Sequence, residues 1–165
     1  MNRKTAMKLF GLLGLLMLLS CGYADRHRNN SSCEQVLVDS LEVRVQDSLF
    51  SNVHYSRSQV LDALTQAQDS QVYYRLLALY GKTFFVSSDF DSILYYNRRV
   101  KEFFRNASQS SESLQSPQWN DVLSDVYNIE GNVWMQLNRP DSAITDYKKA
   151  YEYRLKGKKL HLLPD

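Results

Sequence analysis

Apolar side chains recur at spacings of three, four and seven residues along most of the chain after residue 70, the spacing of one helix face. Such patterns cover 73–86 and 90–104, with Asn97 as the polar exception, and return over 122–137 and 143–151. Ser87-Ser88-Asp89 and Asn138-Arg139-Pro140 interrupt them with residues that cap or begin helices. The pattern therefore predicts two helical hairpins.

The two predicted hairpins repeat each other at an offset of fifty residues. Sliding 77–104 over 127–154 places Gly81 on Gly131 and Phe84 on Trp134. Only four of the chain's glycines lie beyond residue 20, and two of them fall in this register. A glycine lets two helices approach closely, and an aromatic ring fills the space beside it. We predict that each unit packs around its glycine.

This pattern resembles the tetratricopeptide repeat, most closely in the second unit. Glu130 stands where the family prefers leucine, and Ile93 where it prefers a small residue. The resemblance covers about 70–156 and implies helix pairs stacked into a short solenoid. The implied repeat core is Leu77, Gly81, Phe84, Ile93, Leu94, Tyr127, Gly131, Trp134, Ala143, Ile144, Tyr147 and Ala150.

The fold class predicted for the whole chain is all-α, a short α-solenoid of about three hairpins, close to the minimum for a stable stack. Residues 34–69 are predicted to be a degenerate hairpin, although Val43 and Val45 around Arg44 also permit a short strand. The remaining divisions are a repeat over 70–105, a polar insertion over 106–121, a repeat over 122–156 and a tail over 157–165. Trp119, inside the insertion, is expected to be a packing anchor.

The first twenty residues predict export. Arg3, Lys4 and Lys8 precede eleven apolar residues over 9–19, too few for a permanent membrane span. Ser20-Cys21 then resembles a bacterial lipobox, which implies a signal peptide over 1–20, lipidation of Cys21 and a tether over 21–33. Gly22 after the cysteine favours sorting to the outer membrane, by resemblance to enteric lipoproteins. The lipobox together with the repeats resembles an envelope lipoprotein of Bacteroidetes type, expected on the periplasmic face of that membrane. Cys33 would then have no partner for an internal disulfide.

Charge and motifs argue against nucleic-acid binding and catalysis. Without the three cations of 1–20, the formal net charge changes from +2 to −1, so no basic footprint remains. There is no glycine-rich phosphate loop, and His27, His54 and His161 lie far apart. We expect no enzyme activity, no metal, no cofactor and no small-molecule substrate.

Two sets of surface residues follow from the repeat resemblance and from a short motif. Asp-Ser followed by an apolar residue resembles an O-glycosylation signal of Bacteroidetes, which makes Ser40 and Ser48 candidate sites. In related stacks the first helix of each hairpin lines a concave face that binds extended peptides or helices. That face is predicted to contain Arg75, Lys82, Phe85, Val86, Asp125, Asn128, Asn132, Met135 and Gln136.

The predicted function is therefore a non-catalytic scaffold that binds a protein or peptide partner. Arg75 and Lys82 would favour an acidic segment. One alternative is the N-terminal sensor region of a longer membrane signalling protein such as a histidine kinase, because the sequence ends without a polar capping helix. A minor alternative is part of a SusD-like glycan-binding lipoprotein.

Overall fold

The computed structural model describes residues 35–107 and 117–157. The predicted signal peptide, the lipidation site Cys21, the tether with Cys33 and most of the predicted tail lie outside these ranges. The central part of the predicted insertion, 108–116, also lies outside them.

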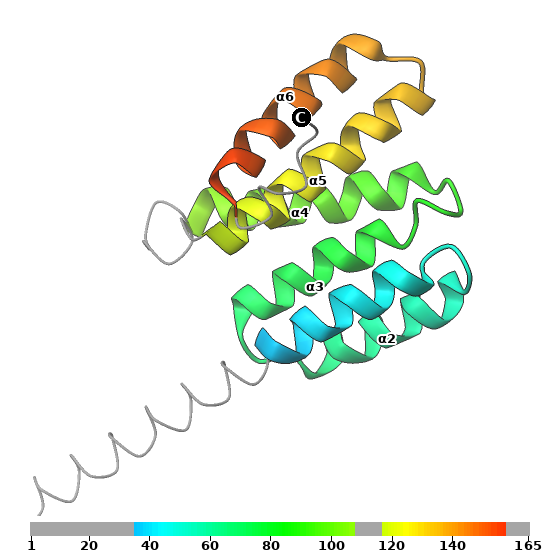
Figure 1. The fold of residues 1–165 in the computed structure, drawn as a ribbon, viewed down its shortest axis with the longest axis vertical. Helices are drawn as coiled ribbons and strands as arrows, with labels where there is room; N and C mark the ends of the chain where they lie inside the picture. Colours follow the sequence, from blue (N-terminus) through cyan, green and yellow to red (C-terminus); the bar gives the residue numbers. More distant parts are fainter. Residues whose placement is uncertain (1–34, 108–116, 158–165) are drawn as a thin grey trace, which may run out of the picture.

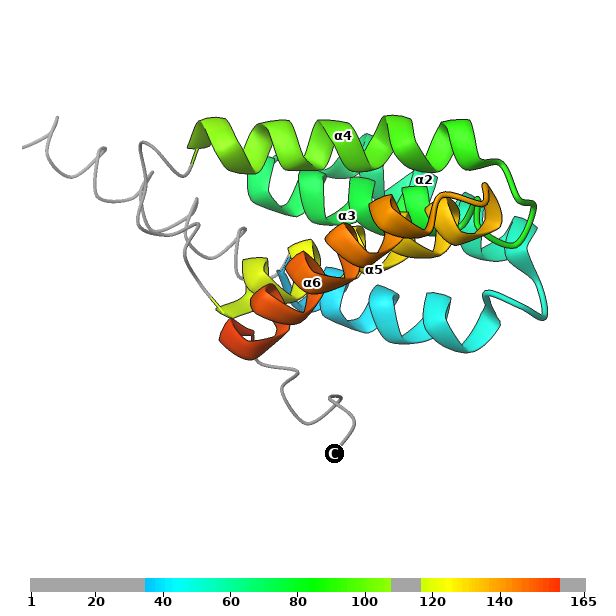
Figure 2. The ribbon, with the colours of Figure 1, turned by 90° about the horizontal axis from the view of Figure 1, so that it is seen from above.

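Every regular element in the described ranges is a helix, so this part of the chain is all-α. Helices follow one another as antiparallel neighbours, and the three pairs are stacked in chain order (Figures 1 and 2). No helix in these ranges combines the length and apolarity that a membrane crossing requires. The helices are 35–48, α2 (Val53–Gln66), α3 (Ser70–Lys82), α4 (Phe90–Ala107), α5 (Pro117–Gln136) and α6 (Pro140–Lys156).

The segment 35–48 is a helix, which excludes the strand that its valines also permitted. Val38, Leu41, Val45 and Leu49 follow helical spacing and are buried, so the segment has one apolar face. They share a core with Val60 of α2 and with three apolar residues of α3. The first hairpin therefore packs directly on the second.

Both repeat glycines lie where the two helices of their hairpin meet. A Cβ added to Gly81 would lie 3.1 Å from the Cβ of Tyr96 on α4. A Cβ added to Gly131 would collide with the ring of Tyr147 on α6, whose hydroxyl donates a 2.8 Å hydrogen bond to Asn132 Oδ1. The close approach predicted around each glycine is thus confirmed.

The turns between the helices of the two hairpins also repeat at the fifty-residue offset. Ser88 and Asn138 both adopt the left-handed conformation, with φ of 54° and 55°. Each turn is closed by the same two backbone bonds, a pattern that satisfies the last carbonyls of a helix. In donor-to-acceptor order they are Ser88 to Phe85 (3.0 Å), Asp89 to Phe84 (3.2 Å), Asn138 to Met135 (3.1 Å) and Arg139 to Trp134 (2.8 Å).

The start of the second helix differs between the two hairpins. In the first, the backbone N–H and the hydroxyl of Ser92 both donate to the carboxylate of Asp89, at 3.1 and 2.7 Å. These bonds hold the pKa of Asp89 below its usual value. Arg139 occupies the equivalent place in the second hairpin and makes no side-chain cap bond.

Most of the predicted repeat core is buried or half-buried in the described structure. Trp119 is also buried, against Phe103 and Phe104, as expected of a packing anchor. Its helix α5 begins at Pro117, so residues 117–121 belong to a helix and not to the predicted insertion. The buried members of the predicted core are Leu77, Gly81, Ile93, Gly131, Ala143 and Ala150, and the half-buried ones are Phe84, Leu94, Tyr127, Trp134 and Tyr147.

The prediction that Ile144 belongs to the core is wrong, because this residue is 51% exposed. Leu94, its counterpart fifty residues earlier, is half-buried because Ile129 and Val133 of the following helix α5 pack in the same cluster. The periodicity of α6 alone does not reveal whether such a helix follows.

Polar side chains help to join α4 to α5. Asn97, the polar exception in the α4 pattern, is fully buried and donates from Nδ2 to the carbonyl of Val126 at 3.2 Å. Glu130 is buried as well, and its carboxylate accepts a 2.6 Å bond from Lys101 Nζ. Burial raises the pKa of Glu130, and Lys101 only partly opposes this shift.

We predict that Glu130→Gln gains stability relative to the wild type as the pH rises. A raised folded-state pKa means that the stabilising contribution of Glu130 is complete below its ordinary pKa of 4.5 and is lost as the pH rises through the raised value. Glutamine stays neutral throughout. The unfolding free energy of Glu130→Gln minus that of the wild type, measured by urea denaturation between pH 4 and 8, should therefore rise with pH. Lys101→Met, which keeps Glu130, should make stability fall more steeply with pH than in the wild type. A value of variant minus wild type that falls with pH would contradict the assignment.

Candidate functional site

A groove of about 720 Å³ lies between the first helices of the three hairpins. Its walls are the segment 35–48 and α5, with α3 between them and one residue contributed by α6. Both polar and apolar residues line it. The described residues that line it are Asp39, Glu42, Val43, Gln46, Arg75, Ala78, Leu79, Lys82, Gln118, Asp121, Val122, Asp125, Val126, Ile129 and Arg154.

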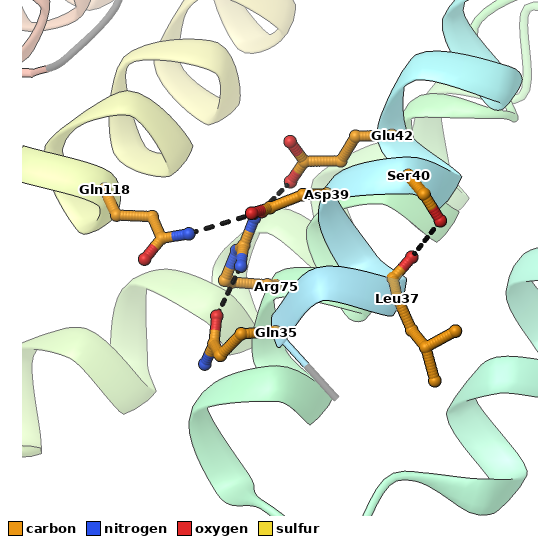
Figure 3. Close-up of polar contacts among 7 residues, drawn as sticks. All are labelled: Gln35, Leu37, Asp39, Ser40, Glu42, Arg75 and Gln118. Atoms are coloured by element: carbon orange, nitrogen blue, oxygen red, sulfur yellow. Dashed lines mark hydrogen bonds and ion pairs between the residues drawn. The ribbon is translucent and has the colours of Figure 1, made fainter. Parts of the chain in front are cut away.

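Arg75 of α3 lines the groove and is bonded to the helix 35–48. Figure 3 shows its contacts. Only 3% of its side chain is exposed, and Nη2 contacts Asp39 at 2.7 Å and Glu42 at 3.0 Å. Nη1 donates to Gln35 at 2.6 Å, so all three partners belong to the helix 35–48. Gln118 of α5 reaches the same Asp39 oxygen at 3.4 Å, which links three helices through one carboxylate.

The other two basic residues of the groove also contact neighbours in this chain. Lys82 Nζ donates to Gln46 at 2.5 Å, and Arg154 Nη2 pairs with Asp125 at 2.5 Å. The groove thus carries four acidic and three basic side chains, and each of the three basic ones has a partner here. The expectation that Arg75 and Lys82 attract an acidic segment therefore has no support, because Nη1 and Nη2 of Arg75 and Nζ of Lys82 already donate to the helix 35–48.

The structure brings three of the nine predicted concave-face residues into the groove, namely Arg75, Lys82 and Asp125. Phe85 and Val86 do not line it because α3 ends at Lys82 and the chain turns away. The other four lie beside the groove or beyond Ile129, its last lining residue on α5. They are Asn128, Asn132, Met135 and Gln136, of which Asn132 is bonded to Tyr147.

The sequence pattern did not identify the groove wall formed by the helix 35–48. Asp39, Glu42, Val43 and Gln46 follow helical spacing, but the alternative of a strand for this segment left their direction undefined. Gln118 and Asp121 were assigned to the polar insertion and so could not be placed on α5. The available signal was the apolar spacing of four between Leu41, Val45 and Leu49.

Both candidate glycosylation residues lie on the helix 35–48. The hydroxyl of exposed Ser40 donates to the carbonyl of Leu37 at 3.0 Å (Figure 3). The Ser48 hydroxyl donates to the carbonyl of Arg44 at 2.7 Å and also lies 2.8 Å from the hydroxyl of buried Ser56. Ser40 is therefore the more accessible of the two.

Within residues 35–107 and 117–157, no three histidine, cysteine, aspartate or glutamate side chains gather as a metal site. The described residues that line the groove include no histidine, cysteine or hydroxyl group. Comparison with known protein families, curated proteins and solved structures found no match to this chain. The arrangement offers apolar contacts and hydrogen bonds, which are the means of binding a segment of another protein.

We predict that Arg75→Met costs more stability than Asp39→Asn. Removing the buried guanidinium leaves two carboxylates without their cation, a loss of about 1–3 kcal/mol after allowance for their partial hydration. Asp39 is 58% exposed, so its neutralisation should cost less than about 1 kcal/mol. Urea denaturation followed by circular dichroism measures both, and equal costs would show that Arg75 is not the centre of this network.

Proposed function

We propose that the chain is a non-catalytic lipoprotein of the bacterial envelope that binds a protein segment in the groove between its first helices. The observation that carries the proposal is the groove itself, which three separate hairpins line with their first helices. Stacked helical hairpins with the tetratricopeptide pattern use this face for binding. The repeat of glycines and turns at fifty residues supports the same assignment.

The groove has room and suitable chemistry for part of a peptide or helix. Its volume of about 720 Å³ lies within the range of about 300–1,000 Å³ typical of ligand sites. Val43, Ala78 and Leu79 offer apolar contacts, and Val43 is 62% exposed. Because the cations of the groove are engaged internally, the partner we propose is an apolar segment with neutral or basic flanks.

The proposed location rests on the N-terminal sequence. The charged residues, the apolar run over 9–19 and Ser20-Cys21 occur in the order of a lipoprotein signal. Two or more acyl chains on Cys21 would anchor the chain stably to a membrane. The scaffold would then present its groove within the envelope, most simply on the periplasmic side of the outer membrane.

A photo-crosslinking amino acid at Val43 tests the groove. We expect one dominant adduct in intact cells, because this exposed side chain would touch the bound segment. Leu61 on α2 is the matched control, since it is 47% exposed but does not line the groove. Mass spectrometry should identify a single crosslinked peptide, and Val43→Arg should weaken the binding of that synthetic peptide about tenfold. Equal adducts from both positions would contradict the proposal.

Cys21→Ser tests the anchor separately. We expect it to abolish incorporation of an alkyne-labelled fatty acid and to move the protein from the membrane fraction to the soluble fraction. Cys33→Ser, which changes the other cysteine, should leave both properties as in the wild type. Labelling of the Cys21→Ser variant at the wild-type level would show that the chain is not lipidated at this position.

A further inference from the structure

Helix α6 carries an exposed face, the α6 face, which consists of Ile144, Lys148, Tyr151 and Leu155 together with the half-buried Tyr147. Ile144 is 51% exposed, Tyr151 55% and Leu155 50%, and they follow one another at helical spacing. A shallow depression of about 370 Å³ is lined by Ile144, Tyr147, Lys148, Tyr151 and Glu152. Figure 1 shows α6 at the outer end of the stack, opposite the first hairpin.

The fifty-residue repeat shows what this face is suited to receive. On α4, the contacts to the following helix α5 come from Leu94, Asn97, Lys101 and Phe104. The equivalent positions on α6 are Ile144, Tyr147, Tyr151 and Arg154. Three of the four belong to the α6 face. The α6 face therefore corresponds to a surface that, one hairpin earlier, is covered by an antiparallel helix.

We propose that the α6 face binds the same face of a second copy of this chain, in an antiparallel pair about a two-fold axis. In that register Ile144 meets Leu155 of the partner and Lys148 meets both Tyr151 and Glu152 of the partner. Each contact occurs twice, as two-fold symmetry requires. Two apolar contacts thus lie outside two ion pairs that are centred on the axis.

Charge supports a second copy as the occupant. Lys148 and Glu152 are both exposed, and neither has an ion-pair partner in the described ranges. Within one helix, a lysine four residues before a glutamate is the less favourable order for a pair. Across an antiparallel interface the same two residues face each other with opposite charge. The face is therefore complementary to itself.

The pair of helices sets the expected strength. One helix packed on another buries less surface than a standard interface, which buries about 800 Å² on each partner. We therefore expect a dimer with a dissociation constant in the micromolar range, on the order of 1–50 µM. Attachment of both copies to one membrane would raise their effective concentration and favour the dimer.

Sedimentation equilibrium of the full chain in density-matched detergent tests the proposal. Lys148→Glu and Glu152→Lys should each raise the dissociation constant about tenfold, because each places four like charges around the axis. The double variant restores opposite charges and should return to within about threefold of the wild type. Circular dichroism checks that each variant keeps its helices.

Tyr151→Ala should also weaken the dimer, while Tyr55→Ala is the matched control. Tyr55 is a similarly exposed tyrosine on α2, at 51%, so its loss should leave the dissociation constant unchanged. A wild-type chain that stays monomeric at about 100 µM would overturn the proposal. The α6 face would then be a surface for a helix other than its own copy. A double charge variant no better than the single ones would overturn the proposed register.

Discussion

The close contact of two helices around a glycine is the constraint on which the rest of this structure depends. Helices of 13 to 20 residues are at most marginally stable alone, so each needs a neighbour to bury its apolar face. Gly81 lets the neighbouring helix approach until its Tyr96 lies against the glycine, and Gly131 does the same for Tyr147. The turns at Ser88 and Asn138, which share the same conformation and the same two backbone bonds, then return the chain.

Contacts between hairpins include buried polar groups as well as apolar side chains. Arg75 joins the first hairpin to the second, while Asn97 and Glu130 take part in joining the second to the third. Buried polar groups are costly unless they are paired, so they favour one arrangement of the joined surfaces over its alternatives. Apolar packing supplies the attraction between hairpins, and these bonds define how one hairpin lies on the next.

The sequence predicted well what depends on local spacing. Helical periodicity and the fifty-residue offset located four of the helices, both glycine contacts and the two breaks, because each follows from neighbouring residues. Whether a face is covered depends on another part of the chain, and for this reason Ile144 was misplaced. Predicting the groove required knowing which side of three different helices faces inward. The segment 35–48 forms one of its walls, and the short valine pattern of this segment fits two conformations.

In the proposed mode of binding, the Arg75 network would couple occupancy of the groove to the position of the first hairpin. Asp39 and Glu42 line the groove, and their carboxylates also pair with Arg75, which joins the first hairpin to the second. A bound segment that competes for either carboxylate would weaken the contact between the first and second hairpins, and this cost would lower its affinity. By thermodynamic reciprocity, a change that strengthens the contact between these hairpins would also change the affinity for that segment.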